Sequence, residues 1–225
     1  MSEFDLVIFD CDGVLIDSEI ISARMLVSEL YRLGLDIDLG YVERNFLGRS
    51  YPVVMEVIRR EFGLDLPPDF EARYRENLLT VFQTELKIVP HVREVLGAMA
   101  VPFCVATSSS PRRAGMSLAL VGLAPLIGDR LFTSTMVAHG KPAPDLFLYA
   151  AAKMGADPAR TLVIEDSLTG IRAALAAGMT VWRFVGGSHL GAATTEEPED
   201  ARPHRRLVSF QSFFQIAPTL TRQTA

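Results

Sequence analysis

The chain has 225 residues, which suits one sizeable domain or a core domain that carries a smaller inserted one. Hydrophobic residues make up 49% of the sequence and charged residues 22%, so a packed core is available and wholesale disorder is not expected. The net charge of −5 offers no overall attraction to nucleic acid or to an anionic membrane surface, so neither is expected as a partner.

The first residues carry no targeting pattern. No basic segment precedes the apolar run at 6–9, and that run is far too short for a signal sequence. No stretch approaches the roughly 18 apolar residues that a membrane span requires. A soluble cytoplasmic protein is therefore expected. Cys11 and Cys104 lie in apolar runs, which favours buried, reduced thiols over a disulfide or a metal pair.

Short apolar runs along the chain have the pattern of buried parallel strands. They are Leu6–Phe9, Phe103–Ala106, Leu162–Ile164 and Val181–Phe184. Helical patterns lie between them: one from Pro111 to about Val121, one from Pro144 to about Met154, and one from Ser167 to Gly178. After a loop-like stretch at 186–204, a short strand is expected near 207–208 and a helix from about 211. The alternation predicts an α/β fold with a doubly wound parallel sheet.

Residues 17–87 interrupt this alternation. Helical spacing is present at about 20–33, 53–62 and 70–85, and no strand pattern separates these stretches. The sequence therefore predicts a core domain formed by 1–16 and 88–225, with an all-helical domain inserted at 17–87.

Polar side chains gather where the predicted strands end. They are Asp10 and Asp12, Thr107 to Ser110, Glu165 and Asp166, with Lys141 in a Gly-Lys-Pro loop before a helix. In a doubly wound sheet these positions meet in one crevice. Carboxylates crowded there would repel each other unless a divalent cation neutralised them, and oxygen ligands suit Mg²⁺. A turn, a helix cap or a solvated charge explains each group alone, but not why all of them lie at one edge.

Four segments resemble the sequence motifs of the haloacid dehalogenase superfamily. They are Val7–Ser18, Val105–Ser108, Gly140–Pro142 and Val163–Ser167. The helical insertion is similar to the cap of the β-phosphoglucomutase-like and sugar-phosphatase branch, and the resemblance covers essentially the whole chain. The first motif, through Glu19, also resembles the 6-phosphogluconate phosphatase type. The resemblance implies a Rossmann-like core and a sugar or sugar-acid phosphate as substrate.

The resemblance also implies residue roles. Asp10 would attack phosphorus and form an aspartyl-phosphate, and Asp12 would act as the acid and base. Mg²⁺ would be held by Asp10, the backbone carbonyl of Asp12, Asp166 and Glu165. The groups expected to bind the phosphoryl oxygens are Thr107, Ser108 and Lys141. The predicted function is that of a Mg²⁺-dependent phosphatase for a small phosphorylated metabolite, acting as a monomer or weak homo-oligomer.

A sugar phosphomutase remains an alternative, because it shares every core motif. The segment 47–51 resembles the specificity loop of the cap, where β-phosphoglucomutases carry a lysine and an arginine at the positions of Leu47 and Tyr51. Their absence favours hydrolysis. Cap contacts with substrate are expected from Ser18, Arg49 and Tyr51, although a surface charge explains Arg49 equally well.

A phospho-aspartate signalling switch is an alternative of another class, since it too combines aspartates, Mg²⁺, a hydroxyl and a lysine on such a sheet. In that fold the phosphorylated aspartate follows a middle strand and the domain is about half this length. A binding protein derived from an enzyme is disfavoured, because no expected core residue is missing. No role follows from the sequence for Cys11, His139 or His189.

Overall fold

The computed structural model describes residues 2–46, 51–190 and 197–222. These residues contain a six-stranded parallel sheet with the strand order β3-β2-β1-β4-β5-β6. The strands are β1 (Leu6–Phe9), β2 (Phe103–Thr107), β3 (Leu131–Thr133), β4 (Thr161–Glu165), β5 (Thr180–Phe184) and β6 (Arg205–Leu207). The order reverses beside β1, so the crevice at the carboxyl ends of the sheet lies near the end of β1. The predicted doubly wound parallel sheet is confirmed.

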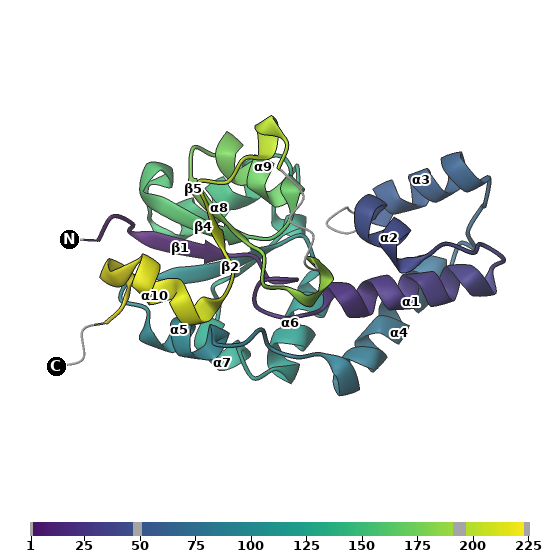
Figure 1. Cartoon of the computed structure of the whole chain (residues 1–225), viewed down its shortest axis with the longest axis horizontal. Helices are drawn as coiled ribbons and strands as arrows, with labels where there is room; N and C mark the ends of the chain where they lie inside the picture. Colours follow the sequence, from purple (N-terminus) through teal and green to yellow (C-terminus); the bar gives the residue numbers. More distant parts are fainter. Residues whose placement is uncertain (1, 47–50, 191–196, 223–225) are drawn as a thin grey trace.

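Helices cover both faces of the sheet (Figure 1). They are α5 (Val92–Ala98), α6 (Pro111–Leu120), α7 (Ala124–Ile127), α8 (Asp145–Met154), α9 (Leu168–Ala176) and α10 (Phe213–Ile216). Successive side chains of a strand point to opposite faces. Accordingly Val7 and Phe9 pack in the cluster formed with α5, α6, α7 and α10, while Leu6 and Ile8 pack against α8 and α9. Both faces of β1 are apolar because both are covered.

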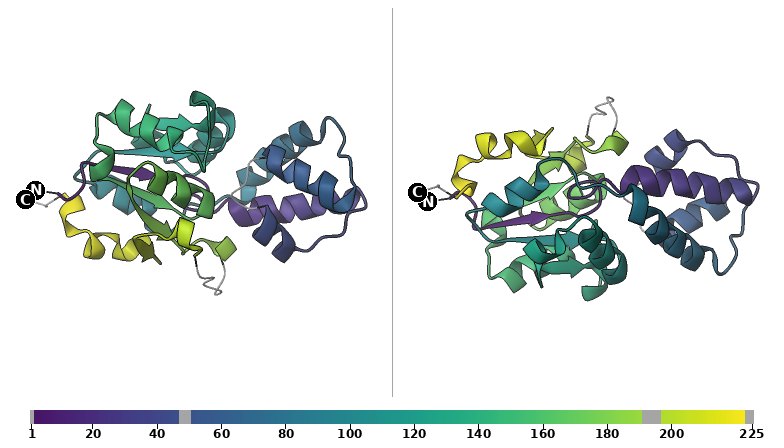
Figure 2. Two further views of the ribbon diagram at one scale, coloured as in Figure 1. Left: turned by 90° about the horizontal axis from the view of Figure 1, so that it is seen from above. Right: turned by 90° about the horizontal axis from the view of Figure 1, so that it is seen from below.

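The remaining helices form a separate group with its own hydrophobic core. They are α1 (Glu19–Arg32), α2 (Leu39–Asn45), α3 (Tyr51–Phe62) and α4 (Phe70–Glu85). Leu30, Ile58 and Phe82 are among the buried residues of this core. Figure 2 shows this helical segment beyond one end of the sheet, away from the two termini. In the part of the chain that the structure describes, no helix is long and apolar enough to span a bilayer.

Several short elements were not expected from the sequence. β3 has three residues, and α2 and α5 have seven each. Two helical turns or three strand residues are too few to establish a hydrophobic period, so the pattern carries little information there. Tertiary packing decides these elements: β3 pairs with β2, and α5 buries Val92, Val95 and Leu96.

Candidate active site

The loop after β1 passes directly over the end of β4. Gly13 has a φ of 79°, a conformation that glycine adopts without steric cost. A Cβ atom at Gly13 would lie 2.2 Å from Oδ2 of Asp166 and 2.9 Å from Cε1 of His189. The absence of a side chain at Gly13 therefore allows this loop to lie against the Asp166 carboxylate.

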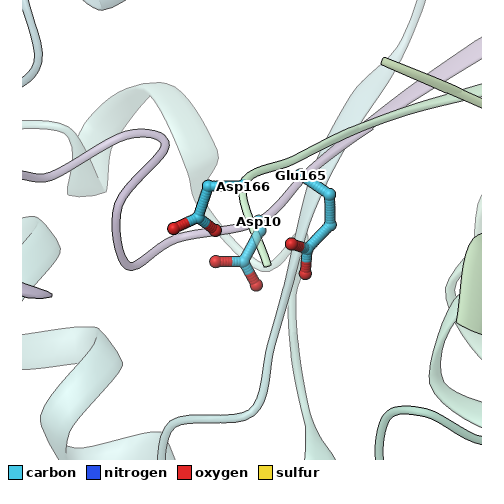
Figure 3. A group of neighbouring side chains, drawn as sticks. All are labelled: Asp10, Glu165 and Asp166. Atoms are coloured by element: carbon cyan, nitrogen blue, oxygen red, sulfur yellow. The ribbon is translucent and has the colours of Figure 1, made fainter. Parts of the chain in front are cut away.

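Three carboxylates meet at the ends of β1 and β4. Asp10, Glu165 and Asp166 are buried, and each offers an oxygen within 4.8 Å of the others. Their carboxylates lie close together in Figure 3. Burial raises the pKa of Asp10 well above its ordinary value; Lys141 opposes the rise, and the charges of Glu165 and Asp166 increase it. Lys141 contributes one positive charge against three carboxylates, so the donor set and its remaining charge suit a divalent cation.

Lys141 joins two of these carboxylates. Its Nζ donates to Oδ1 of Asp10 at 2.6 Å, to Oε1 of Glu165 at 2.8 Å and to the backbone oxygen of Ala106 at 3.0 Å. The other carboxylate oxygen of Glu165 accepts from the amide and the hydroxyl of Ser167. Both oxygens of Glu165 are thus engaged by the protein, so this carboxylate orients Lys141 in addition to belonging to the acidic cluster.

The position of Glu165 depends on a glycine in α9. A Cβ atom at Gly170 would lie 1.7 Å from Oε1 of Glu165. In an ordinary helix a Gly→Ala change stabilises by up to ~1 kcal/mol, but here the clash must displace the carboxylate. We expect Gly170→Ala to lower the free energy of unfolding by about 1–3 kcal/mol, the usual cost of overpacking.

Urea unfolding measures this change, and Gly115→Ala in α6 is its matched control. Apart from its chain neighbours and the surrounding backbone of α6, no described atom lies within 4 Å of a Cβ atom built at Gly115, so that substitution is expected to stabilise. A stabilised Gly170→Ala protein would show that Glu165 can move without cost.

Asp12 faces a different set of donors. One carboxylate oxygen accepts from the hydroxyl of Ser18 at 2.6 Å and from Arg113 at 2.8 Å, and the other accepts from the hydroxyl of Ser109 at 2.6 Å. Burial alone would raise the pKa of Asp12, but the charge of Arg113 and the hydroxyl bonds lower it below its ordinary value. Two carboxyl groups of one loop are therefore held in opposite electrostatic environments.

Arg113 was not among the residues predicted from the sequence, and Ser109 was named only as part of the run Thr107 to Ser110. Ser110 caps α6, where its side chain accepts from the amide of Arg113. The guanidinium of Arg113 lies 5.5 Å from the ring centre of Phe82 in α4, and it also donates to the hydroxyl of Ser22 in α1. The spacing of four residues from Ser109 to Arg113, across the start of a predicted helix, is the sequence signal that could have found the pair.

The hydroxyl residues after β2 occupy unequal positions. Thr107 is buried; its Oγ1 accepts from the amide of Ser109 at 3.0 Å and lies 3.5 Å from Oδ2 of Asp12. Ser108 is exposed, and its backbone oxygen accepts from the hydroxyl of Ser134. Both residues line the same cavity as Asp10 and Lys141.

This cavity, of about 600 Å³, lies between the strand ends and the helical segment. Tyr51 lines it from α3, beneath the guanidinium of Arg75 at 5.7 Å, and its hydroxyl has no partner among the described residues. Ser18 is buried beside the cavity as the residue before α1, whereas Arg49 lies outside the described residues. Glu19 also lines the cavity, and burial together with the charge of Asp12 raises its pKa to about 7.

A doubly wound sheet with a buried acidic cluster beneath a cavity is an arrangement that α/β enzymes use. Residues 4–178 match the model of the haloacid dehalogenase-like hydrolases. The 6-phosphogluconate phosphatase of Escherichia coli K12 is 28% identical over 84% of this chain and 86% of its own. The phosphorylated carbohydrates phosphatase of Thermotoga maritima is 32% identical over 78% and 82%.

A solved structure supports the same relationship. A haloacid dehalogenase family hydrolase from Deinococcus radiodurans R1, with bound phosphate and sodium, is 32% identical. It superposes with a TM-score of 0.79 over 98% of this chain and 99% of its own. The chain belongs to the haloacid dehalogenase-like hydrolases and is a phosphatase of that family, so the predicted family and enzyme class are confirmed.

Proposed function

We propose that the protein is a Mg²⁺-dependent phosphatase that hydrolyses a sugar or sugar-acid phosphate through an aspartyl-phosphate on Asp10. The observation that carries the proposal is the buried cluster of Asp10, Glu165 and Asp166, with Lys141 bonded to two of its carboxylates, at one end of a cavity of about 600 Å³. Asp10 lies in an acidic cluster that suits a cation, while Asp12 is held by hydroxyls and Arg113. The phosphatases among the relatives support sugar phosphates as the substrate class.

In this proposal each group at the strand ends has one task. Asp10 attacks phosphorus and takes the phosphoryl group, which divides hydrolysis into two easier steps. Asp12 is assigned as the acid toward the leaving alcohol and as the base toward the attacking water; its lowered pKa, with neither metal nor substrate bound, fits the base step. The groups proposed to bind the phosphoryl oxygens are Thr107, Ser108 and Lys141, each of which lines the cavity.

The buried carboxylates fit a divalent cation of the hard, oxygen-preferring kind. We assign Asp10 and Asp166 as its main ligands, with the backbone carbonyl of Asp12, and Glu165 as a ligand whose oxygens already have protein donors. A bound Mg²⁺ would neutralise the charge that develops on the phosphoryl oxygens.

Residues 17–87 are proposed to act as a cap domain on a core of 1–16 and 88–225. The helical segment has its own hydrophobic core and supplies one wall of the cavity. Arg112 in α6 is ion-paired with Glu76 in α4, so the two parts touch at the cavity rim. Closure of such a cap would exclude water other than the nucleophile, and Ser18 and Tyr51 would contact the substrate from the cap side. Arg49 is likewise proposed to contact the substrate.

Phosphate release from a panel of sugar and polyol phosphates tests the function. We expect release in Mg²⁺, a fall to the buffer background in EDTA, and full recovery when Mg²⁺ is added back. Isomerisation of a sugar phosphate without net release would replace the phosphatase with the mutase. A stable phosphoprotein without turnover of a chromogenic phosphoester would support the signalling switch instead.

A further inference from the structure

We propose that His189 is a positioning residue: its imidazole holds the carboxylate of Asp166 in the orientation that binds the divalent cation. This inference rests on the proposed cation site. His189 lies in a short turn, Ser188–Leu190, that belongs to neither of the two aspartate loops. Its imidazole nevertheless contacts the acidic cluster, although the turn follows β5 in the chain.

The contact is short and buried. Nε2 of His189 lies 2.9 Å from Oδ2 of Asp166, and the side chains are 4% and 7% exposed. Nδ1 of His189 has no hydrogen-bond partner among the described residues. The contact with Asp166 is thus the polar interaction that accounts for an imidazole at this depth, since a buried ring without such a bond would be costly.

Two glycines make room for the ring. A Cβ atom at Gly187 would lie 2.7 Å from Cε1 of His189, and one at Gly13 would lie 2.9 Å from the same atom. Gly13 comes from the loop after β1 and Gly187 from the segment after β5. The imidazole therefore occupies a slot whose walls come from two separate segments, and both segments lack side chains at the points of contact.

The turn that carries His189 is fastened next to the nucleophile loop. Oδ1 of Asp17 accepts from the amide of Ser188 at 3.1 Å and from its hydroxyl at 2.9 Å. Asp17 directly precedes Ser18, which binds Asp12. The backbone on the N-terminal side of the histidine is thus held by the same loop that carries Asp10 and Asp12, so the imidazole has a defined place relative to the cluster.

A hydrogen bond from Nε2–H to one oxygen fixes the rotation of the Asp166 carboxylate and leaves its other oxygen for the cation. Hydrogen-bond partners of metal-binding carboxylates usually contribute 10- to 100-fold to metal affinity. Asn at position 189 is too short to place a donor where Nε2 lies, whereas the amide nitrogen of Gln reaches about as far as Nε2. His189→Asn therefore removes both the ring and the donor, whereas His189→Gln removes the ring and keeps a donor near the position of Nε2.

The test is the Kd for Mg²⁺, measured by calorimetric titration of the full-length apoprotein, together with Tm in EDTA. We expect His189→Asn to raise the Kd about 10- to 100-fold and His189→Gln to restore most of the affinity. The matched control is His91→Asn: His91 is exposed, and its positive φ of 66° is one that Asn accommodates. Its Kd is expected to equal that of the wild type.

An unchanged Kd in folded His189→Asn would overturn the inference and leave the cation site intact. A lower Tm in EDTA with unchanged Mg²⁺ affinity would also overturn it, because the ring would then serve packing alone. Absence of Mg²⁺ binding by the wild type would remove the proposed cation site itself, which is a separate and recognisable failure. If His189→Asn does not fold, the Kd values of His189→Gln and of Ser188→Ala, which loosens the turn, are compared instead. A raised Kd in Ser188→Ala with a Kd near that of the wild type in His189→Gln would support the inference, and a wild-type Kd in both would overturn it.

Discussion

Replacing Asp10 with Asn is expected to reduce phosphate release by roughly 10⁶-fold, the loss that removal of a covalent nucleophile causes when the rest of a site stays in place. Asn keeps the shape of the side chain but lacks the anionic oxygen that attacks phosphorus. Oδ1 of this carboxylate accepts from Lys141, and the carboxylate belongs to the acidic cluster, so the substitution also weakens cation binding. The measurement is Mg²⁺-dependent phosphate release from the best substrate of the panel.

Asp5→Asn is the matched control for this variant. Asp5 precedes β1 at the end of the strand opposite to Asp10, where it forms an exposed ion pair with Arg160. Phosphate release by the Asp5→Asn protein is expected to equal that of the wild type. Comparable release by the Asp10→Asn and wild-type proteins would exclude Asp10 as the nucleophile, whatever the metal dependence.

Lys141→Met is expected to lower the free energy of unfolding by about 3–5 kcal/mol at pH 8 in EDTA, and to abolish phosphate release. The side chain of Lys141 is 3% exposed and contacts two carboxylates that are themselves buried. Removing one partner of a buried ion pair leaves an uncompensated charge, which costs far more than the pair contributed. The measurement is urea unfolding, with exposed Lys153→Met in α8 as the control that is expected to change little.

The stability deficit of Lys141→Met has a predictable pH dependence. Burial already raises the pKa values of Asp10 and Glu165 in the folded protein, and loss of the ammonium raises them further. A carboxyl whose pKa is higher in the folded than in the unfolded protein stabilises the fold fully below its unfolded pKa of about 4. That stabilisation is lost as the pH rises through the pKa of the folded protein. The deficit relative to wild type should therefore be smaller at pH 5 than at pH 8; an equal deficit would show that the carboxylates are not coupled to Lys141.

The location of the candidate site could be predicted from the sequence because it depends on the parallel direction of the strands. An apolar run followed at once by Asp10 and Asp12 places both at the carboxyl end of a buried strand, and Glu165 follows a second such run. Parallel strands bring their carboxyl ends to one edge whatever the intervening helices do. The structure accordingly brings Asp10, Glu165 and Asp166 within 4.8 Å of one another.

The length of an element decided how well its limits could be predicted. The ten-residue helix α6 and the sixteen-residue helix α4 were placed within one or two residues, because each has several turns and clear end signals. The three-residue strand β3 was missed because its pairing with β2 is a tertiary interaction.

By itself the sequence determined the fold class, the family and the edge of the sheet where the chemistry is proposed, since these follow from local periodicity and from motifs of a few residues. Only the tertiary structure decided which donors each carboxylate faces. Arg113 meets Asp12 across 101 residues, and His189 meets Asp166 through a turn that glycines allow to approach. Such contacts depend on how loops from different strands pack, and the free energy of that packing is spread over many residues outside any motif.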